Sequence, residues 1–523
     1  MKNLIVFAMV AVSLIIFYGC QKEEIIIDQS EVIPQNDFTF KEGQIKLGEK
    51  LENPYSVENM HRAYNNIKDK LKSAIDIDTT HYYVRFLPKT DKKLMELLQD
   101  TTLEFYDYPL DVEMEQGGTY YHDPSIPVGK PTWQYTVVPV DYSFPEIEFE
   151  KLASLYLQNE DDDGNLKSNT DAYLDWAKLE NEALRITNNL DENQSGETEK
   201  GSRWYPSGVI QAEDDLLNRL IPIEGVKVRA NRWFTTKTGY TNSSGYFQTG
   251  SFKRPVNYSI KWERGYYDIR NGSLLQAYYN GPKQTGSWDL DIYGGESIMY
   301  ATMHRAAHKH FYGDNLGIFS PVLPGSKTKI CYIDKFGTGV FWGDWSATGI
   351  LPDIKIWGKD ANNNYHNTNT IFGFTAHELG HQSHSLYMGN IQFWQTTKVI
   401  YESWATAVEW ALTNDEYHKL GAQYNIHAAI NYNHEAGHHW WPVISNDVAY
   451  SPIFIDLIDD ENQRDFHGST DYPNDVITGY TLQYINQNIL HDSYGISSLT
   501  NALKAHKITG ISDEDIDKLT ELY

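Results

Sequence analysis

The spacing of apolar and polar residues predicts alternating helices and strands in the first part of the chain. Between residues 56 and 75 apolar side chains recur at helical spacing, and Ser56 is placed to cap the first turn. Residues 81–87 (HYYVRFL) have the aromatic and β-branched content of a strand, and a second helix is expected over residues 171–190. The pattern therefore predicts an N-terminal α/β region over residues 51–200.

Short alternating runs between residues 221 and 285 predict a small β-sandwich, which follows a polar, linker-like stretch at residues 191–202. The runs GVKVRA and TGYTNSSGYF, which begin at Gly225 and Thr238, resemble the regulatory-like, transthyretin-type module of carboxypeptidases and bacterial surface proteins. The resemblance implies an accessory domain without chemistry of its own, expected over residues 203–285.

From about residue 286 the apolar spacing becomes helical, and residues 296–311 predict a helix that ends near Gly313. His304 and His308 lie one turn apart on this helix, a spacing that could hold a metal ion. No further ligand is evident, so both are interpreted as core or surface histidines. The fold class expected for the whole chain is multidomain α+β, with a mainly helical domain over residues 286–523.

The segment Thr375–His381 (TAHELGH) has two histidines four residues apart and a glutamate after the first, the pattern HExxH. On a helix, residues four apart share a face, so His377 and His381 can reach one metal ion from the same side. Glu378 lies beside that face and can contact a water on the ion. Imidazole and carboxylate ligands suit Zn²⁺, which keeps an open position for a reactive water.

The metzincin extension of HExxH is absent, because it would place glycine and histidine where this chain has His384 and Tyr387. Downstream, YESWA, with Glu402 as its second residue, lies on a helix expected over residues 397–412. HELGH together with YESWA resembles the gluzincins, the thermolysin-like zinc peptidases. The resemblance implies that Glu402 is the third metal ligand and that the small residues after it let two helices pack closely.

Two further side chains are placed near this predicted centre. Glu409 lies seven residues after Glu402 on the same helical face. It is interpreted as a side chain that contacts a metal ligand without binding the metal itself, or as ordinary helix surface. It also remains the alternative third ligand. His384 also faces the metal side and is interpreted as an outer hydrogen-bonding group.

The resemblance also implies a strand beside the substrate cleft and a general-base mechanism. Residues 353–357 (DIKIW) are the candidate cleft strand, where an extended substrate would add by main-chain hydrogen bonds. Zinc would lower the pKa of its bound water, and Glu378 would take the proton and return it to the leaving amine. The side chain that stabilises the oxyanion is left open among four candidates, which are His434, His438, His439 and Tyr480.

The N-terminus is typical of an exported lipoprotein. Lys2 precedes an apolar run over residues 4–17, and Gly19-Cys20 resembles the lipobox of bacterial lipoproteins. A signal peptide is therefore expected over residues 1–19, lipidation at Cys20 and a polar tether over residues 20–50. An ordinary cleaved signal with an incidental cysteine is the alternative. The QKEE run after Cys20 resembles a surface-export signal, so the expected location is the outer membrane, facing outward.

Composition limits the partners. The chain has 71 acidic and 44 basic residues, for a net charge of -27, which argues against nucleic acid because phosphate binding needs a basic face. The acidic run at residues 160–165 lacks the full spacing of a calcium loop and is interpreted as a solvated turn. Cys331 is the one cysteine besides Cys20, so no intrachain disulfide is expected after lipidation. A monomer that contacts the membrane through its lipid alone is expected.

The leading hypothesis is a zinc peptidase that acts on extracellular proteins or peptides. Zn²⁺ is the expected cofactor, held by His377, His381 and Glu402, with Glu378 as the base. Two alternatives stay open: a degenerate scaffold that binds glycans or host proteins, and a zinc hydrolase of a non-peptide amide. Glu378 argues against the first, because a binding protein needs no base between two metal ligands.

Overall fold

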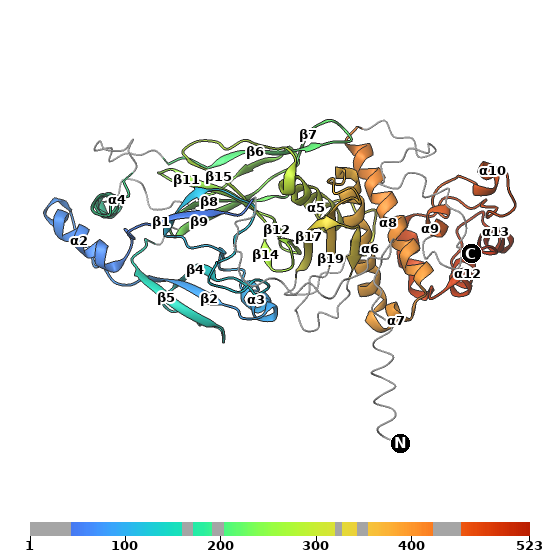
Figure 1. The fold of residues 1–523 in the computed structure, drawn as a ribbon, viewed down its shortest axis with the longest axis horizontal. Helices are drawn as coiled ribbons and strands as arrows, with labels where there is room; N and C mark the ends of the chain where they lie inside the picture. Colours follow the sequence, from blue (N-terminus) through green and yellow to red (C-terminus); the bar gives the residue numbers. More distant parts are fainter. Residues whose placement is uncertain (1–42, 159–170, 191–202, 320–326, 342–353, 422–450) are drawn as a thin grey trace, which may run out of the picture.

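The computed structural model describes residues 43–158, 171–190, 203–319, 327–341, 354–421 and 451–523. The predicted signal peptide, Cys20, the acidic run at 160–165 and the linker at 191–202 lie outside these ranges. Within them, no helix is both long enough and apolar enough to cross a membrane. The molecule is elongated, with the N-terminal elements at one end and the last helices at the other (Figure 1).

The N-terminal region combines two small antiparallel sheets with three helices. β1 pairs with β3, and β2 lies between β4 and β5. The strands are β1 (Lys46–Lys50), β2 (His81–Leu87), β3 (Val112–Gln116), β4 (Gln134–Pro139) and β5 (Glu148–Leu155). The helices are α2 (Val57–Ile67), the 3₁₀ turn η1 (Lys68–Lys70), α3 (Asp91–Leu98) and α4 (Asp171–Ile186).

The first predicted helix and strand are both present, with one boundary moved. The Ser56 side chain accepts the backbone N–H of Asn59, as a helix cap does. The helix stops at Ile67, short of residue 75, because η1 tightens the chain and Leu71 is already extended. Strand β2 covers the predicted residues 81–87. Strand β1 lies inside the range predicted as a tether, so part of that range is built into a sheet.

Two sheets in the middle of the chain form the sandwich. The first has β6 (Ser207–Asp214) between β10 (Tyr246–Gln248) and β16 (Leu290–Ile292), with β7 (Arg219–Pro222) also paired to β6. The second runs in the order β15 (Tyr278–Gln284), β11 (Val256–Lys261), β8 (Lys227–Arg232), β9 (Thr235–Tyr240). Every second residue of β6 is buried, as expected for a strand with one face on a core.

A six-stranded sheet follows the sandwich and lies next to the helices. Its order is β12-β13-β17-β19-β18, with β14 paired to β13, and β13, β17 and β19 are parallel. The strands are β12 (Glu263–Arg264), β13 (Tyr267–Asn271), β14 (Leu275–Gln276), β17 (Thr328–Phe336), β18 (Gly339–Phe341) and β19 (Ile354–Lys359). The first three come from the range predicted as sandwich, and β16 joins the sandwich from beyond residue 285. Strand pairing therefore crosses the boundary placed at residue 286.

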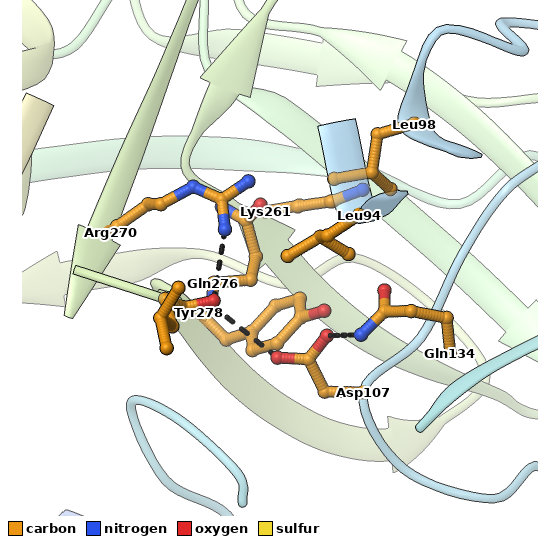
Figure 2. A pocket seen from close by; sticks show the side chains of 9 residues that line it. Leu94, Leu98, Asp107, Gln134, Lys261, Arg270, Gln276 and Tyr278 are labelled. Carbon is orange, nitrogen blue, oxygen red and sulfur yellow. Dashed lines mark hydrogen bonds between the residues drawn. The ribbon is translucent and has the colours of Figure 1, made fainter. Parts of the chain in front are cut away.

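Buried polar contacts join the N-terminal region to these sheets around a small pocket (Figure 2). Asp107 accepts hydrogen bonds from the Gln134 side chain (2.8 Å) and from the Gln276 backbone N–H (3.4 Å). Burial raises the pKa of Asp107 to about 6, although these bonds and the nearby Lys261 and Arg270 oppose the shift. The cavity is lined by groups that already contact one another, so it is a structural junction.

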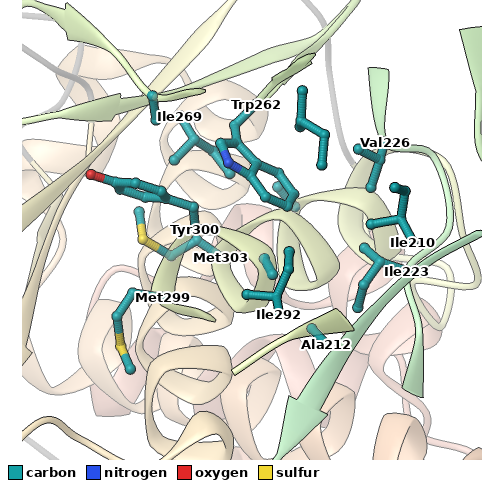
Figure 3. Packing of buried hydrophobic residues seen from close by; sticks show 14 of the residues in the cluster. Ile210, Ala212, Ile223, Val226, Trp262, Ile269, Ile292, Met299, Tyr300 and Met303 are labelled. Atoms are coloured by element: carbon teal, nitrogen blue, oxygen red, sulfur yellow. The ribbon is translucent and has the colours of Figure 1, made fainter. Parts of the chain in front are cut away.

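One hydrophobic core runs from the sandwich through helix α5 (Gly295–Phe311) to the six-stranded sheet. Figure 3 shows Ile210 and Ile292 of the sandwich in one cluster with Trp262 and with Met303 of α5. The described chain is thus a mixed α+β structure with several sheets, as predicted. Its central sheets share a core and do not form separate hydrophobic units.

Helices dominate the rest of the chain. They are α6 (Thr368–Met388), α7 (Asn390–Gln395), α8 (Lys398–Lys419), α9 (Ile453–Asp456), α10 (Gln463–His467), α11 (Leu482–Asn488), the 3₁₀ turn η5 (Leu490–Asp492), α12 (Ile496–Ala505) and α13 (Asp513–Thr520). A second core gathers Trp404 and Leu412 of α8 with Leu499 and Ile516 of the last two helices. Helix α8 therefore lies between α6 and the C-terminal helices (Figure 1).

Candidate metal centre

Helix α6 carries the HExxH segment through the interior of the protein. Apolar residues around the segment, among them Ile371, Phe372 and Leu379, are buried, and the helix ends at Gly389, whose φ of 83° favours glycine. His377, Glu378 and His381 are all almost fully buried. Because buried polar groups are costly unless they find partners, the contacts of these side chains indicate what the centre can do.

The side chains of His377, His381 and Glu402 converge on one point. Glu402 Oε2 lies 3.5 Å from His377 Nε2 and 3.2 Å from His381 Nε2. Each residue offers a ligand atom within 4.8 Å of the other two, and among the described residues this group alone satisfies that condition. Glu402 is fully buried on α8. The structure thus brings together the two histidines and the glutamate that the sequence singled out.

Close contact between α6 and α8 makes this convergence possible. Gly380, inside the HExxH segment, faces Ala405 and Val408 of α8. A Cβ at position 380 would lie 3.3 Å from Ala405 Cα and 3.1 Å from Val408 Cβ, tighter than ordinary contacts. Small residues at this crossing therefore bring Glu402 within reach of the histidines, as the resemblance implied for the residues after Glu402.

Glu409 supports His377 from the side away from the convergence point. Glu409 Oε2 lies 3.0 Å from His377 Nδ1, and both side chains are buried. A carboxylate that accepts the Nδ1 proton leaves Nε2 with its lone pair available to a metal, the usual arrangement around metal-bound histidines. This geometry fits the interpretation of Glu409 as a side chain that contacts the ligand His377 without binding the metal. The carboxylate that converges with the two histidines belongs to Glu402.

Strand β18 holds Glu378 in place. The backbone N–H of Phe341 donates a hydrogen bond to the Glu378 carboxylate. A Cβ at Gly339 would lie 2.5 Å from Glu378 Oε1, so the carboxylate occupies space that only glycine leaves open. Glu378 Oε2 has no hydrogen-bond partner among the described residues. This buried, unpaired oxygen is free to accept a proton or a water.

The electrostatics of the centre fit a divalent cation. Burial raises the pKa of Glu378 to about 8; His377 opposes the shift, and the carboxylates of Glu402 and Glu409 add to it. Burial would also raise the pKa of Glu402, but His381 and His377 lower it well below its ordinary range, so this ligand is ionised. A cation between the ligands would offset the crowded negative charge. Two imidazole nitrogens and one carboxylate oxygen form a common donor set for Zn²⁺.

Of the histidine pair predicted as core or surface residues, His304 lies in the core and His308 is partly buried. His304 is fully buried between the Tyr267 hydroxyl, 3.0 Å from Nδ1, and the Glu224 carbonyl, 2.9 Å from Nε2. The His308 ring stacks on Tyr312 at 5.6 Å. Burial lowers the pKa of His304 to about 3 and that of His308 to about 4.

The described residues do not give His384 the predicted hydrogen-bonding role. Neither of its ring nitrogens has a hydrogen-bond partner among the described residues, and the side chain is fully buried. Its ring packs against Phe393 at 5.2 Å and Trp404 at 6.5 Å. Burial lowers its pKa to about 3, so it is a neutral ring in an aromatic cluster.

The prediction of the cleft strand is wrong. Strand β19, which contains most of the predicted residues 353–357, has a neighbour on both sides, β17 in parallel and β18 antiparallel. Among the described strands, the one at the end of the sheet, beside Glu378, is β18. Three residues, Gly339–Phe341, are too short for a periodic signal, so sequence reasoning missed this strand.

The candidates for oxyanion stabilisation are only partly placed. His434, His438 and His439 lie outside the described residues. Tyr480 is buried in the core of the C-terminal helices, where its ring packs against Tyr484 at 5.7 Å. The structure therefore gives Tyr480 a packing role.

Comparisons with models of known protein families, with curated proteins and with solved structures found no match to this chain. What can be said of its chemistry consequently rests on the geometry above.

Replacing Glu409 by glutamine is expected to weaken metal binding about 10- to 100-fold, the usual effect of losing the carboxylate behind a histidine ligand. The amide keeps the volume and can still contact Nδ1, but it removes the charge that makes the imidazole more basic. Competition against a chromophoric chelator measures the affinity. The exposed Glu521→Gln provides the matched control, and equal affinity in Glu409→Gln and the parent would show that the contact does not tune the ligand.

Proposed function

We propose that this protein is a zinc-dependent peptidase that hydrolyses peptide bonds of extracellular proteins. The observation that carries the proposal is the buried convergence of His377, His381 and Glu402, beside a Glu378 carboxylate oxygen that has no partner in the described part of the chain. A structural zinc site would have four protein ligands and no need of an adjacent base, whereas a catalytic site keeps one position open.

The protein's own groups divide the work of hydrolysis. Bound Zn²⁺ would supply an acidified water and polarise the scissile carbonyl. Glu378 would accept the proton of the attacking water and return it to the leaving amine, while the Phe341 N–H and the glycine at position 339 keep its carboxylate in position. The main chain of a peptide would pair with β18, which is the end strand of the sheet among the described strands and lies beside Glu378.

The proposed setting is the cell surface. It rests on the lipobox-like segment that ends at Cys20, which implies an outer-membrane lipoprotein anchored by its lipid. Labelling with a radioactive fatty acid, compared between the parent and Cys20→Ala, tests the anchor. Label retained in Cys20→Ala would contradict it.

Metal removal tests the proposed activity directly. The purified chain should contain about one zinc per molecule, cleave members of a peptide library, lose the activity on treatment with 1,10-phenanthroline and regain it with added Zn²⁺. Zinc content is measured by mass spectrometry and cleavage by chromatography of the products. If the protein contains stoichiometric zinc and hydrolyses other amides but no peptides, it is a zinc hydrolase of a non-peptide amide and not a peptidase. Zinc with no turnover would favour a binding protein.

Gly339→Ala is expected to lower kcat about 100-fold with little change in zinc content, because the added Cβ displaces the Glu378 carboxylate by a fraction of an ångström or more. Gly495→Ala is the matched control, since a Cβ there would lie in ordinary contact, 3.5 Å from Thr397. Steady-state kinetics on one cleaved peptide measure the effect. Unchanged kcat in Gly339→Ala would mean that the position of Glu378 does not depend on β18.

A further inference from the structure

Three exposed tyrosines gather around Arg264, on residues that the metal centre does not use. Tyr240 ends β9, Tyr266 lies between β12 and β13, and Tyr312 caps the C-terminus of α5. These tyrosines are 47, 39 and 36 % exposed, in that order. The Arg264 guanidinium lies over the Tyr312 ring at 4.2 Å and over the Tyr240 ring at 5.2 Å. Single exposed rings are common on protein surfaces, whereas rings that gather around one cation indicate a binding surface.

Stacked rings hold this arginine in position. The Tyr312 ring stacks on Tyr266 at 5.0 Å and on His308 at 5.6 Å. The Tyr266 backbone N–H donates a hydrogen bond to the Tyr312 hydroxyl at 3.2 Å. Contact with aromatic faces orients the plane of a guanidinium, so less conformational freedom is lost when a ligand binds to it. We call these five residues, Arg264, Tyr240, Tyr266, Tyr312 and His308, the Arg264 cluster.

Two glycines make room for the cluster. At Gly225, whose φ of 79° favours glycine, an added Cβ would overlap Arg264 Nη1 and the His308 ring. At Gly265 an added Cβ would lie 2.8 Å from the Tyr312 hydroxyl oxygen, closer than real Cβ contacts come. The main chain therefore leaves space for these side chains on both sides of the cluster, which supports a built surface over a chance gathering of long side chains.

The donors of Arg264 are not used by the described residues. Within the described chain its guanidinium contacts aromatic rings and forms neither an ion pair nor a hydrogen bond. The neighbouring Glu263 is buried and pairs with Lys227 at 2.8 Å and with Lys261 at 3.1 Å, because successive side chains of a strand point to opposite faces. Burial and the charge of Arg264 lower the pKa of His308 to about 4, so His308 is neutral and Arg264 is the cation of the cluster. Its N–H groups are therefore available to an anion from outside.

We propose that the Arg264 cluster binds an acidic sugar, with the sugar carboxylate on Arg264 and the sugar ring on Tyr240. The planar fork of a guanidinium matches the two oxygens of a carboxylate. A sugar ring has an apolar face of C–H groups and an edge of hydroxyls, and a tyrosine likewise combines an apolar face with a polar hydroxyl. Both faces of Tyr312 already have neighbours, so Tyr240 is the most exposed ring beside the cation.

The charge of the cluster favours an acidic sugar over other partners. Nucleic acid needs several basic side chains along its phosphates, and this cluster has one cation in a chain of net charge -27. A neutral sugar would use the rings but would leave the guanidinium donors without an acceptor. The proposal concerns a second site, so it does not depend on the chemistry proposed for His377, Glu378 and His381.

An array of immobilised glycans with sialylated, uronic-acid-containing, sulfated and neutral members tests the site in the full-length chain. We expect binding to members that carry a carboxylate, and calorimetric titration with the strongest of them gives the affinity. Arg264→Gln should weaken that affinity about 10- to 100-fold, the loss of a charge-assisted contact, and Tyr240→Ala about 2- to 10-fold. Arg62→Gln and Tyr293→Ala change exposed residues outside the cluster and should bind as the parent does.

Three results would overturn the proposal: no binding to any carboxylate-bearing glycan, equal binding to neutral glycans, or binding to sulfated members alone. Parental affinity in both Arg264→Gln and Tyr240→Ala would also overturn it, because the glycan would then bind elsewhere. Circular dichroism checks the fold, and the exposed Tyr240→Ala keeps the test valid if Arg264→Gln folds poorly. Cleavage of short peptides without sugars should be unchanged in both variants, so failure of this site and failure of the proposed peptidase are distinguishable.

Discussion

Glu378→Gln is expected to lower the rate of peptide hydrolysis about 10²- to 10⁴-fold, the range that a positioned general base contributes. Glutamine has nearly the same shape, so the Phe341 N–H can still donate to its side-chain oxygen and the neighbouring ligands should stay in place. The amide cannot accept the proton of the attacking water. Zinc content, measured by mass spectrometry, should therefore equal that of the parent while kcat falls.

Glu521→Gln makes the same chemical change at an exposed residue and should leave both zinc and kcat unchanged. Circular dichroism checks that Glu378→Gln is folded. Cleavage at the parental rate in a folded, zinc-containing Glu378→Gln protein would reject Glu378 as the base and, with it, the proposed mechanism.

Glu402→Gln is expected to weaken zinc binding more than 100-fold, beyond the 10- to 100-fold range of an outer contact such as Glu409. Glu402 Oε2 is the one atom that approaches both His377 Nε2 and His381 Nε2. Removing its charge takes away the anionic ligand and leaves two neutral imidazoles. Zinc affinity is measured by chelator competition, and activity should return only at high added zinc.

Comparing the zinc affinities of the two glutamate variants shows which glutamate is the third ligand. If Glu402 is the ligand, Glu402→Gln loses more affinity than Glu409→Gln; the opposite order would make Glu409 the ligand. Both side chains are almost fully buried on α8, so the two substitutions are matched in environment.

Tertiary contacts decided much of the detail that the sequence left open. The sequence could not show that β18 pairs with β19 beside Glu378, because three residues carry no periodicity and their pairing depends on β19. It could not show that His384 packs among aromatic rings, since the partners Phe393 and Trp404 come from other helices.

What the sequence determined by itself is local. The helical period places His377 and His381 on one face wherever the helix lies, and the same period places Glu402 and Glu409 on one face of α8. Whether these two faces meet is a question of packing, and Gly380 against Ala405 settles it by letting the helices approach. Spacing along a chain is set by backbone geometry, whereas contact between distant segments depends on the shapes that the whole fold brings together.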